Sequence, residues 1–241
     1  MNEEAILAAA RNNAAWCDAV CRAHGGLTSS DDVLWRNSAR SPRFYPNLVT
    51  LRPGRHAAVA DAIERLDDAL PAGWGIKDSF ADLDLRSRGF ARAFEAHWLW
   101  LESTPGTPAA SYDGRIAWAL VATDAALVDW EHAWGEGNAT TPRQFPARLL
   151  ARPEIAFVQG RRDGDVVAGG VLSAAGGAVG ISNVFGEADQ LAACWAHLAG
   201  QAAIRFPGLP LCGYERSEAI AGPLALGFAA IGPLQVWLRE N

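Results

Sequence analysis

Two distant segments of the sequence share one pattern. Residues 86–102, RSRGFARAFEAHWLWLE, and 225–240, ALGFAAIGPLQVWLRE, each pass from a helix end through Gly-Phe-Ala into a strand rich in Trp and Leu. A helix–strand–helix order precedes both. The spacing from Phe to Trp differs by one residue, which a β-bulge absorbs. The pattern predicts a diverged tandem repeat, although a Gly-Phe after a helix is also a common helix C-cap.

Hydrophobic periodicity and turn residues predict alternating helices and strands in both halves. Apolar residues from Leu7 to Cys21 have helical spacing, and Asp124 is the expected N-cap of the helix over 124–137. The loop-like composition of 103–114 places the boundary between expected domains 1–105 and 106–241. The other predicted helices cover 55–73, 82–88, 145–153, 191–206 and 217–226, and the predicted strands 33–35, 45–51, 74–76, 89–102, 115–123, 155–174 (a hairpin), 178–185, 209–214 and 227–240.

The uncharged stretch 166–185 is long enough to be mistaken for a membrane span. It contains five glycines, however, and its central pair Gly176-Gly177 is a hairpin turn signal. We therefore expect two short strands and no membrane partner.

Composition excludes several classes of function. Half of the 241 residues are hydrophobic and the formal net charge is −6, without a basic patch, which argues against nucleic-acid binding. Cys17 and Cys21 lie one helical turn apart on an apolar face and are expected to pack rather than to bind a metal. Acidic residues stand near the N-terminus where a signal peptide needs basic ones, which predicts a cytoplasmic protein.

The second half resembles the GCN5-related N-acetyltransferase (GNAT) superfamily. The resemblance rests on the hairpin and central strand in 155–185, the helix and strand in 190–211, and the last helix, Gly-Phe turn and final strand in 219–240. The first half looks like a shortened, degenerate copy. The resemblance implies an α/β fold with a mixed sheet, the acyl-CoA N-acyltransferase-like fold, in two tandem copies.

The resemblance also implies a chemistry. In that family acyl-CoA lies in a gap between two splayed strands, here those ending near Phe185 and Tyr214, and a small-molecule or peptide amine attacks the thioester directly. We expect acetyl-CoA or another acyl-CoA as co-substrate and no metal, and a homodimer stays open. The cofactor-binding positions that it implies are Asn183, Val184, Phe185, Gly186, Ala188, Gln190 and Leu191.

The turn before the helix at 191–206 departs from the family pattern. The family usually has Gln/Arg-x-x-Gly-x-Gly/Ala there, whereas this turn has Gly186 alone and adds Glu187 and Asp189. Asp189 can cap the helix where a pyrophosphate would lie. An unscreened carboxylate ~4 Å from a pyrophosphate costs about 1–4 kcal/mol. The alternative is therefore a catalytically inactive protein that keeps the fold and binds a ligand or another protein.

Tyr214 and Glu215 are the candidate catalytic residues. They follow a predicted strand at its carboxyl end, where open α/β sheets bind ligands. Tyr214 is the candidate general acid and Glu215 the candidate base or amine binder. The alternatives are a tyrosine on the rim and a glutamate in the first turn of a helix.

Three further residues, Ser182, Trp130 and Trp134, are candidates for substrate binding. Ser182 and Asn183 lie late in the central strand and one of them is expected to face the gap, although Asn183 can instead serve a bulge. Trp130 and Trp134 share a helix face at i, i+4, and form either an aromatic acceptor pocket or part of the core. His197, in an alanine-rich helix, is expected to be structural. We therefore expect an N-acetyltransferase whose N-terminal half supports the fold or completes the acceptor pocket.

Overall fold

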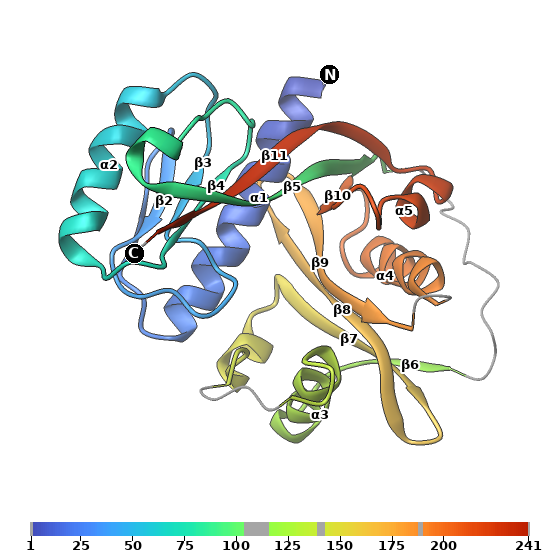
Figure 1. Cartoon of the computed structure of the whole chain (residues 1–241). Helices are drawn as coiled ribbons and strands as arrows, with labels where there is room; N and C mark the ends of the chain where they lie inside the picture. Colours follow the sequence, from blue (N-terminus) through green and yellow to red (C-terminus); the bar gives the residue numbers. More distant parts are fainter. Residues whose placement is uncertain (1, 104–115, 139–142, 188–189, 241) are drawn as a thin grey trace.

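The described chain builds one large mixed sheet with helices on both faces (Figure 1). The computed structural model describes residues 2–103, 116–138, 143–187 and 190–240. The eleven strands lie in the order β1-β2-β3-β4-β11-β5-β10-β9-β8-β7-β6. The expected linker and the expected domain boundary at 105/106 fall largely in 104–115, outside the described residues.

The elements follow the predicted order with shifted ends, except that β1 was not predicted and that the predicted helices 82–88 and 145–153 are short 3-10 helices. The first half contains α1 (Asn2–Ala23), β1 (Thr28–Ser30), β2 (Leu34–Asn37), β3 (Leu48–Thr50), α2 (His56–Ala69), β4 (Gly75–Asp78), the 3-10 helix η1 (Arg86–Arg88) and β5 (Phe90–Leu101). The second half contains β6 (Ala117–Leu120), α3 (Asp124–Trp134), the 3-10 helix η2 (Ala147–Ala151), β7 (Ile155–Arg162), β8 (Asp165–Ala175), β9 (Ala178–Gly186), α4 (Leu191–Arg205), β10 (Leu211–Glu215), α5 (Ala221–Ala225) and β11 (Ala229–Arg239).

One predicted helix cap is wrong. Thr123, not Asp124, is the N-cap of α3, and its side chain accepts a hydrogen bond from the Ala126 amide. Asp124 is the first residue of the helix, where its carboxylate still favours the positive end of the helix dipole. A threonine oxygen reaches the amide as well as an aspartate does, so sequence alone did not separate the two neighbours.

The apolar stretch 166–185 forms the predicted hairpin. Strands β8 and β9 pair antiparallel, with Ala175 opposite Ala178. Gly176 and Gly177 make the turn with φ of 62° and 83°, which glycine adopts without steric cost. Within the described residues, no helix is both long and apolar enough to cross a membrane.

The last strand of each half lies beside the other half. β11 pairs with β4, and β5 pairs with β10, so that the two long strands run together at the centre of the sheet. Two parallel pairs flank them, β3 with β4 and β9 with β10, each connected by a helix, α2 or α4. The β5–β11 ladder shifts register twice, with one extra residue in β11 at Ile231 and one in β5 at Ala93, so each long strand has one irregularity.

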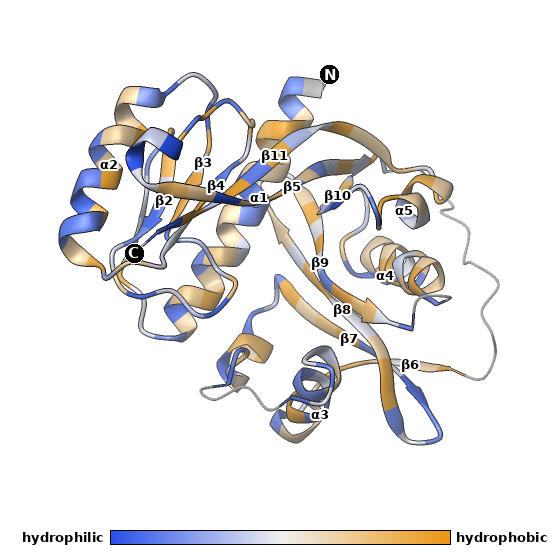
Figure 2. Ribbon diagram, in the orientation of Figure 1, coloured by the Kyte–Doolittle hydropathy of each residue, from blue (hydrophilic) through white to orange (hydrophobic). Residues whose placement is uncertain are grey.

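Alternating side chains of the strands bury opposite faces of the sheet. In β8, Leu172 packs with α4, whereas its neighbour Val171 packs with α3 and the α1 residue Trp16. On the α2 helix, Val59, Ala62, Ile63 and Leu66 face the sheet and hydrophilic residues face outward (Figure 2). Helix α1 thus crosses the second half of the sheet on the face opposite α4.

Candidate functional site

Strands β9 and β10 separate towards their carboxyl ends. Their parallel ladder joins Val179 to Leu211 and Gly180 to Cys212, and it stops there. β9 then continues with β8 alone, whereas Gly213, Tyr214 and Glu215 pair with β5. The space between Ile181–Val184 and Gly213–Glu215 is called the β9–β10 gap below. The two strands separate in the region where the resemblance to the GNAT superfamily implied a gap.

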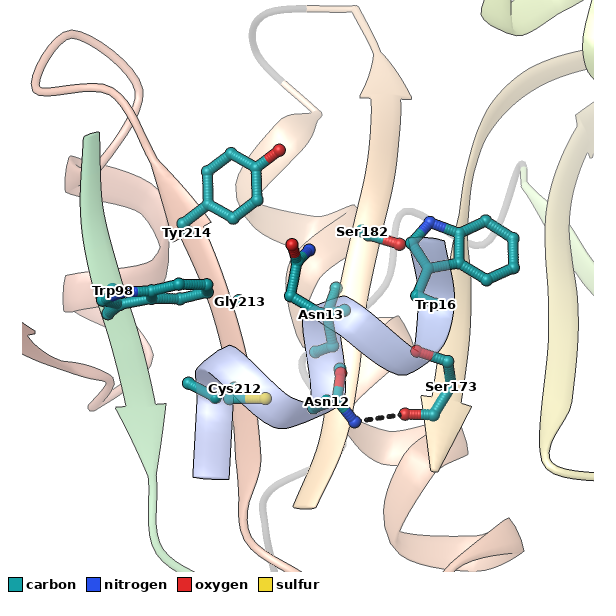
Figure 3. Close-up of a pocket in the computed structure, with 12 residues that line it drawn as sticks. Asn12, Asn13, Trp16, Trp98, Ser173, Ser182, Cys212, Gly213 and Tyr214 are labelled. Carbon is teal, nitrogen blue, oxygen red and sulfur yellow. Dashed lines mark hydrogen bonds between the residues drawn. The ribbon is translucent and has the colours of Figure 1, made fainter. Parts of the chain in front are cut away.

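Helix α1 covers one side of the gap. Asn12, Asn13 and Trp16 line a small cavity of about 10 Å³ together with Ser182 and Tyr214 (Figure 3). The Asn12 side-chain amide donates to the backbone oxygens of Ser173, Ala175 and Ala178 at 2.8, 3.1 and 3.0 Å. These contacts fix α1 to the β8–β9 hairpin and so place Asn13 over the gap.

A wider pocket opens from the same place. Its volume is about 240 Å³, which suits a small molecule. β9 and β10 contribute one wall, with Ser182, Asn183, Tyr214 and Glu215. The first half of the chain contributes the other wall: Asn13, Trp16, Cys17, Phe44, Tyr45, Pro46 and Lys77. The pocket is therefore completed by both halves.

Tyr214 is held by a lysine from the first half of the chain. Lys77 Nζ donates to the Tyr214 hydroxyl oxygen at 3.1 Å and to Asn13 Oδ1 at 2.9 Å. The Tyr214 ring packs edge-on against Trp98 at 5.7 Å between centroids. Because the lysine occupies a lone pair of the hydroxyl oxygen, the O–H of Tyr214 is left to donate elsewhere.

Glu215 ends β10 and lines the wider pocket. Burial raises the pKa of its carboxyl group from the ordinary 4.5 to about 7, while the Arg216 backbone amide and guanidinium lower it less. Glu218 adds a further rise by charge repulsion. A carboxyl group with this pKa exchanges protons near neutral pH, as a general base must.

Ser182 and Asn183 sit at an irregular point of β9. Gly169 pairs with Phe185 but Val171 pairs with Ser182, so the β9 strand bulges between them. Asn183 has φ of 51°, a left-handed conformation that asparagine tolerates better than most residues. Both line the wider pocket, and Ser182 Oγ is buried without a hydrogen-bond partner among the described residues.

The acidic turn before α4 is described in part. Ala188 and Asp189 lie outside the described residues. Glu187 is exposed and pairs with Arg162 at 3.3 Å, so its charge is screened rather than bare. Gln190 is the N-cap of α4 but makes no side-chain cap, and Leu191 begins the helix. Val184, Phe185 and Gly186 complete β9 up to this turn.

The two tryptophans of α3 lie in the aromatic core. Trp130 is fully buried, and its indole N–H donates to the Val158 backbone oxygen at 2.8 Å. Its ring contacts Phe185 at 5.1 Å. Trp134 shares the Phe145 contact but also touches Phe44, at 5.9 Å. This placement favours the core alternative for Trp130, whereas Trp134 does not line the wider pocket and contacts one of its lining residues, Phe44.

Sequence reasoning missed Lys77. It is the sole lysine of the chain, against 20 arginines, and it stands in the short buried strand β4. Its side chain is 4 % exposed. The available signal was a unique lysine directly after the predicted strand 74–76, at an end where open α/β sheets bind ligands.

His197, Cys17 and Cys21 are packed against other side chains or buried. His197 stacks on Trp118 at 4.2 Å, and burial lowers its pKa to about 4. Cys17 and Cys21 are buried as expected. Across the part of the chain that the structure describes, no three His, Cys, Asp or Glu side chains gather as metal ligands.

Comparison with known proteins identifies the fold. No protein-family model and no curated protein matches the sequence. A GCN5-related N-acetyltransferase from Kribbella flavida shares 17% identity with a TM-score of 0.67, over 95% of this chain and 95% of that chain. One from Sphaerobacter thermophilus shares 12% identity with a TM-score of 0.58, over 96% and 92%. A tandem GNAT protein from the clavulanic acid biosynthesis pathway shares 15% identity with a TM-score of 0.54, over 85% and 77%.

These neighbours span nearly the whole chain and cover both halves. Their TM-scores of 0.67 and 0.58 mean that they share the overall arrangement of helices and strands described above. The chain therefore has the fold of the GCN5-related N-acetyltransferases.

Proposed function

We propose that the protein transfers an acyl group from acyl-CoA to a small amine in the β9–β10 gap. The observation that carries the proposal is the end of the β9–β10 ladder at Gly180 and Cys212, with Tyr214 and Glu215 directly beyond it. Past that point the edge of β9 that faces β10 has no ladder partner, so its backbone groups are available to a ligand.

The gap residues suit the thioester and its leaving group. The β9 backbone from Ser182 to Val184 lines the pocket and offers N–H groups for the pantetheine arm and the thioester carbonyl. The N-terminus of α4, where Gln190 makes no side-chain cap, offers amides for the pyrophosphate. Acetyl-CoA supplies the activated acyl carbon when it is bound.

Two side chains carry the proton transfers in this proposal. The neutral acceptor amine attacks the thioester carbon, and Glu215 accepts the proton that the amine nitrogen releases as the new C–N bond forms. Tyr214 donates its hydroxyl proton to the departing thiolate sulfur, while Lys77 Nζ, 3.1 Å from the hydroxyl oxygen, stabilises the tyrosinate that results. Proton exchange with water through the open pocket restores both groups.

A protein that binds a ligand without catalysis is the second candidate. The observation that favours it is the turn at Gly186–Glu187, which lacks the further glycines of the family pattern and carries a carboxylate. The Arg162 pair reduces but does not remove that charge.

The melting temperature with and without acetyl-CoA tests the proposal, with free CoA and desulfo-CoA as controls. A ligand at about a hundred times its dissociation constant adds ~2.7 kcal/mol of stability, or several degrees. We expect a shift with acetyl-CoA and, with an amine present, release of free thiol. No shift at millimolar acetyl-CoA refutes the proposal and leaves the second candidate.

A further inference from the structure

The wider pocket contains a buried cation that no acidic side chain neutralises among the described residues. Lys77 is 4 % exposed, and its two hydrogen-bond partners, the Asn13 amide oxygen and the Tyr214 hydroxyl, are both neutral. Lys77 forms no ion pair with any carboxylate in the part of the chain that the structure describes. Burying an ammonium group is costly unless it is paired, and lysine is almost never buried without a partner.

The surroundings of Lys77 form a polar pocket rather than a core. Ser182 lines the same pocket, and its Oγ is buried without a hydrogen-bond partner among the described residues. An unpaired hydroxyl and a cation with a third N–H can together bind one anionic group. Glu215 lines the same pocket, so an acid–base residue and the cation can contact the same ligand.

One residue that lines the wider pocket, Phe44, is exposed and has a strained backbone. Phe44 is 69 % exposed and has φ of 71°, which is unfavourable for a bulky residue. Strain of this kind persists where surrounding structure enforces it, often at binding sites. Pro46 lines the pocket beside it. An occupant with an apolar group next to its charged end would suit Phe44 and Pro46.

We propose that the acceptor is a small amine that also carries a carboxylate, and that Lys77 and Ser182 bind this carboxylate. The inference rests on the proposed acyl transfer, because it assigns the amine to the Glu215 side of the pocket. In this proposal the first half of the chain determines acceptor specificity, because it contributes Lys77 from β4.

Matched acceptors test the inference. Phenylalanine is compared with phenethylamine, and glycine with methylamine, by kcat/KM for thiol release from acetyl-CoA. We expect the amino acid of each pair to be preferred at least tenfold in the native protein. In Lys77→Met we expect that preference to fall at least tenfold, which corresponds to about 1.4 kcal/mol. Arg65→Gln, an exposed charge on α2 outside the pocket, should leave the preference unchanged.

Three outcomes would overturn the inference while leaving acyl transfer intact. The first is that the native protein does not prefer the amino acid over its matched amine. The second is that the preference is unchanged in Lys77→Met, and the third is that Lys77→Met lowers kcat/KM equally for both members of each pair. The last would mean that Lys77 acts only by supporting Tyr214.

A binding measurement separates failure of this inference from failure of the proposed function. Calorimetric titration with 3-phenylpropanoate and with 3-phenylpropanol needs no catalysis. If no amine is acylated but the acid binds the native protein and not Lys77→Met, acyl transfer is wrong and the carboxylate site stands. If the acid binds neither protein, the site is wrong as well.

Discussion

The substitution Asn12→Asp tests whether the Asn12 side chain fixes α1 to the β8–β9 hairpin beside the gap. Asn12 is 3 % exposed, and its side-chain nitrogen faces the backbone oxygens of Ser173, Ala175 and Ala178. Its Oδ1 faces Gly180, where an added Cβ would meet it at 2.0 Å. Aspartate has the same shape but replaces the donor by an oxygen, so it turns three attractive contacts into repulsive ones.

The size of the effect follows from protonation. An ionised carboxylate cannot face three carbonyls, so the carboxyl group introduced by Asn12→Asp must stay protonated in the folded variant, which means that its pKa is raised. Holding a group of ordinary pKa ~3.9 protonated at pH 7 costs up to about 4 kcal/mol. The proton restores one of the two N–H donors, and the other lost bond costs about 1 kcal/mol. We therefore expect a loss of about 5 kcal/mol at pH 7.

The pH dependence has a definite sign. A carboxyl group with a raised folded pKa causes no electrostatic penalty below the unfolded pKa, and the penalty grows by about 1.4 kcal/mol per pH unit above it. Asn12→Ala is the matched control, because it loses the same donor without adding a titrating group.

Guanidinium chloride unfolding at pH 5 and pH 7.5 measures both variants against the native protein. We expect Asn12→Asp to lose about 3 kcal/mol more at the higher pH, and Asn12→Ala to lose the same amount at both. If the loss in Asn12→Asp does not change with pH, the side-chain nitrogen does not face the three carbonyls and the assigned role of Asn12 is refuted.

Two further predictions concern titrating groups. Glu215→Gln should abolish the rise of acyl-transfer rate through pH 7. Because burial raises the Glu215 pKa to about 7, the variant should be more stable than the native protein by up to about 3 kcal/mol above pH 7 and equally stable below pH 4.5. A stability difference between variant and native protein that is the same at pH 4 and pH 8 would contradict the burial of this carboxyl group. Burial also raises the pKa of the four cysteine thiols to about 11 or 12, so none should react with a disulfide reagent at pH 8 until the protein unfolds, and rapid labelling of the native protein would show that they are accessible.

Local patterns made the element order predictable. The apolar spacing from Leu7 to Cys21 and the Gly176-Gly177 turn each depend on neighbours in sequence, and both appear as predicted. The choice of cap between Thr123 and Asp124 failed because two adjacent residues offered similar oxygen acceptors.

Candidate site residues were predictable where they end a strand of the second half. Tyr214 and Glu215 are the last two residues of β10, and open sheets bind ligands at such ends. Trp130 was open to two interpretations, because the i, i+4 spacing of an aromatic pair is the same in a core and in a pocket wall. Only the contacts with Val158 and Phe185 place its ring in the core.

The sequence by itself determined the alternation of helices and strands, the repeated ending of the two halves and the strand ends that carry Tyr214 and Glu215. The tertiary structure decided that β11 lies beside β4 and β5 beside β10, and that α1 covers the gap. Those long-range pairings bring Lys77 within 3.1 Å of Tyr214, although 137 positions separate them. No local pattern encodes such a contact, because it depends on the packing of the whole sheet.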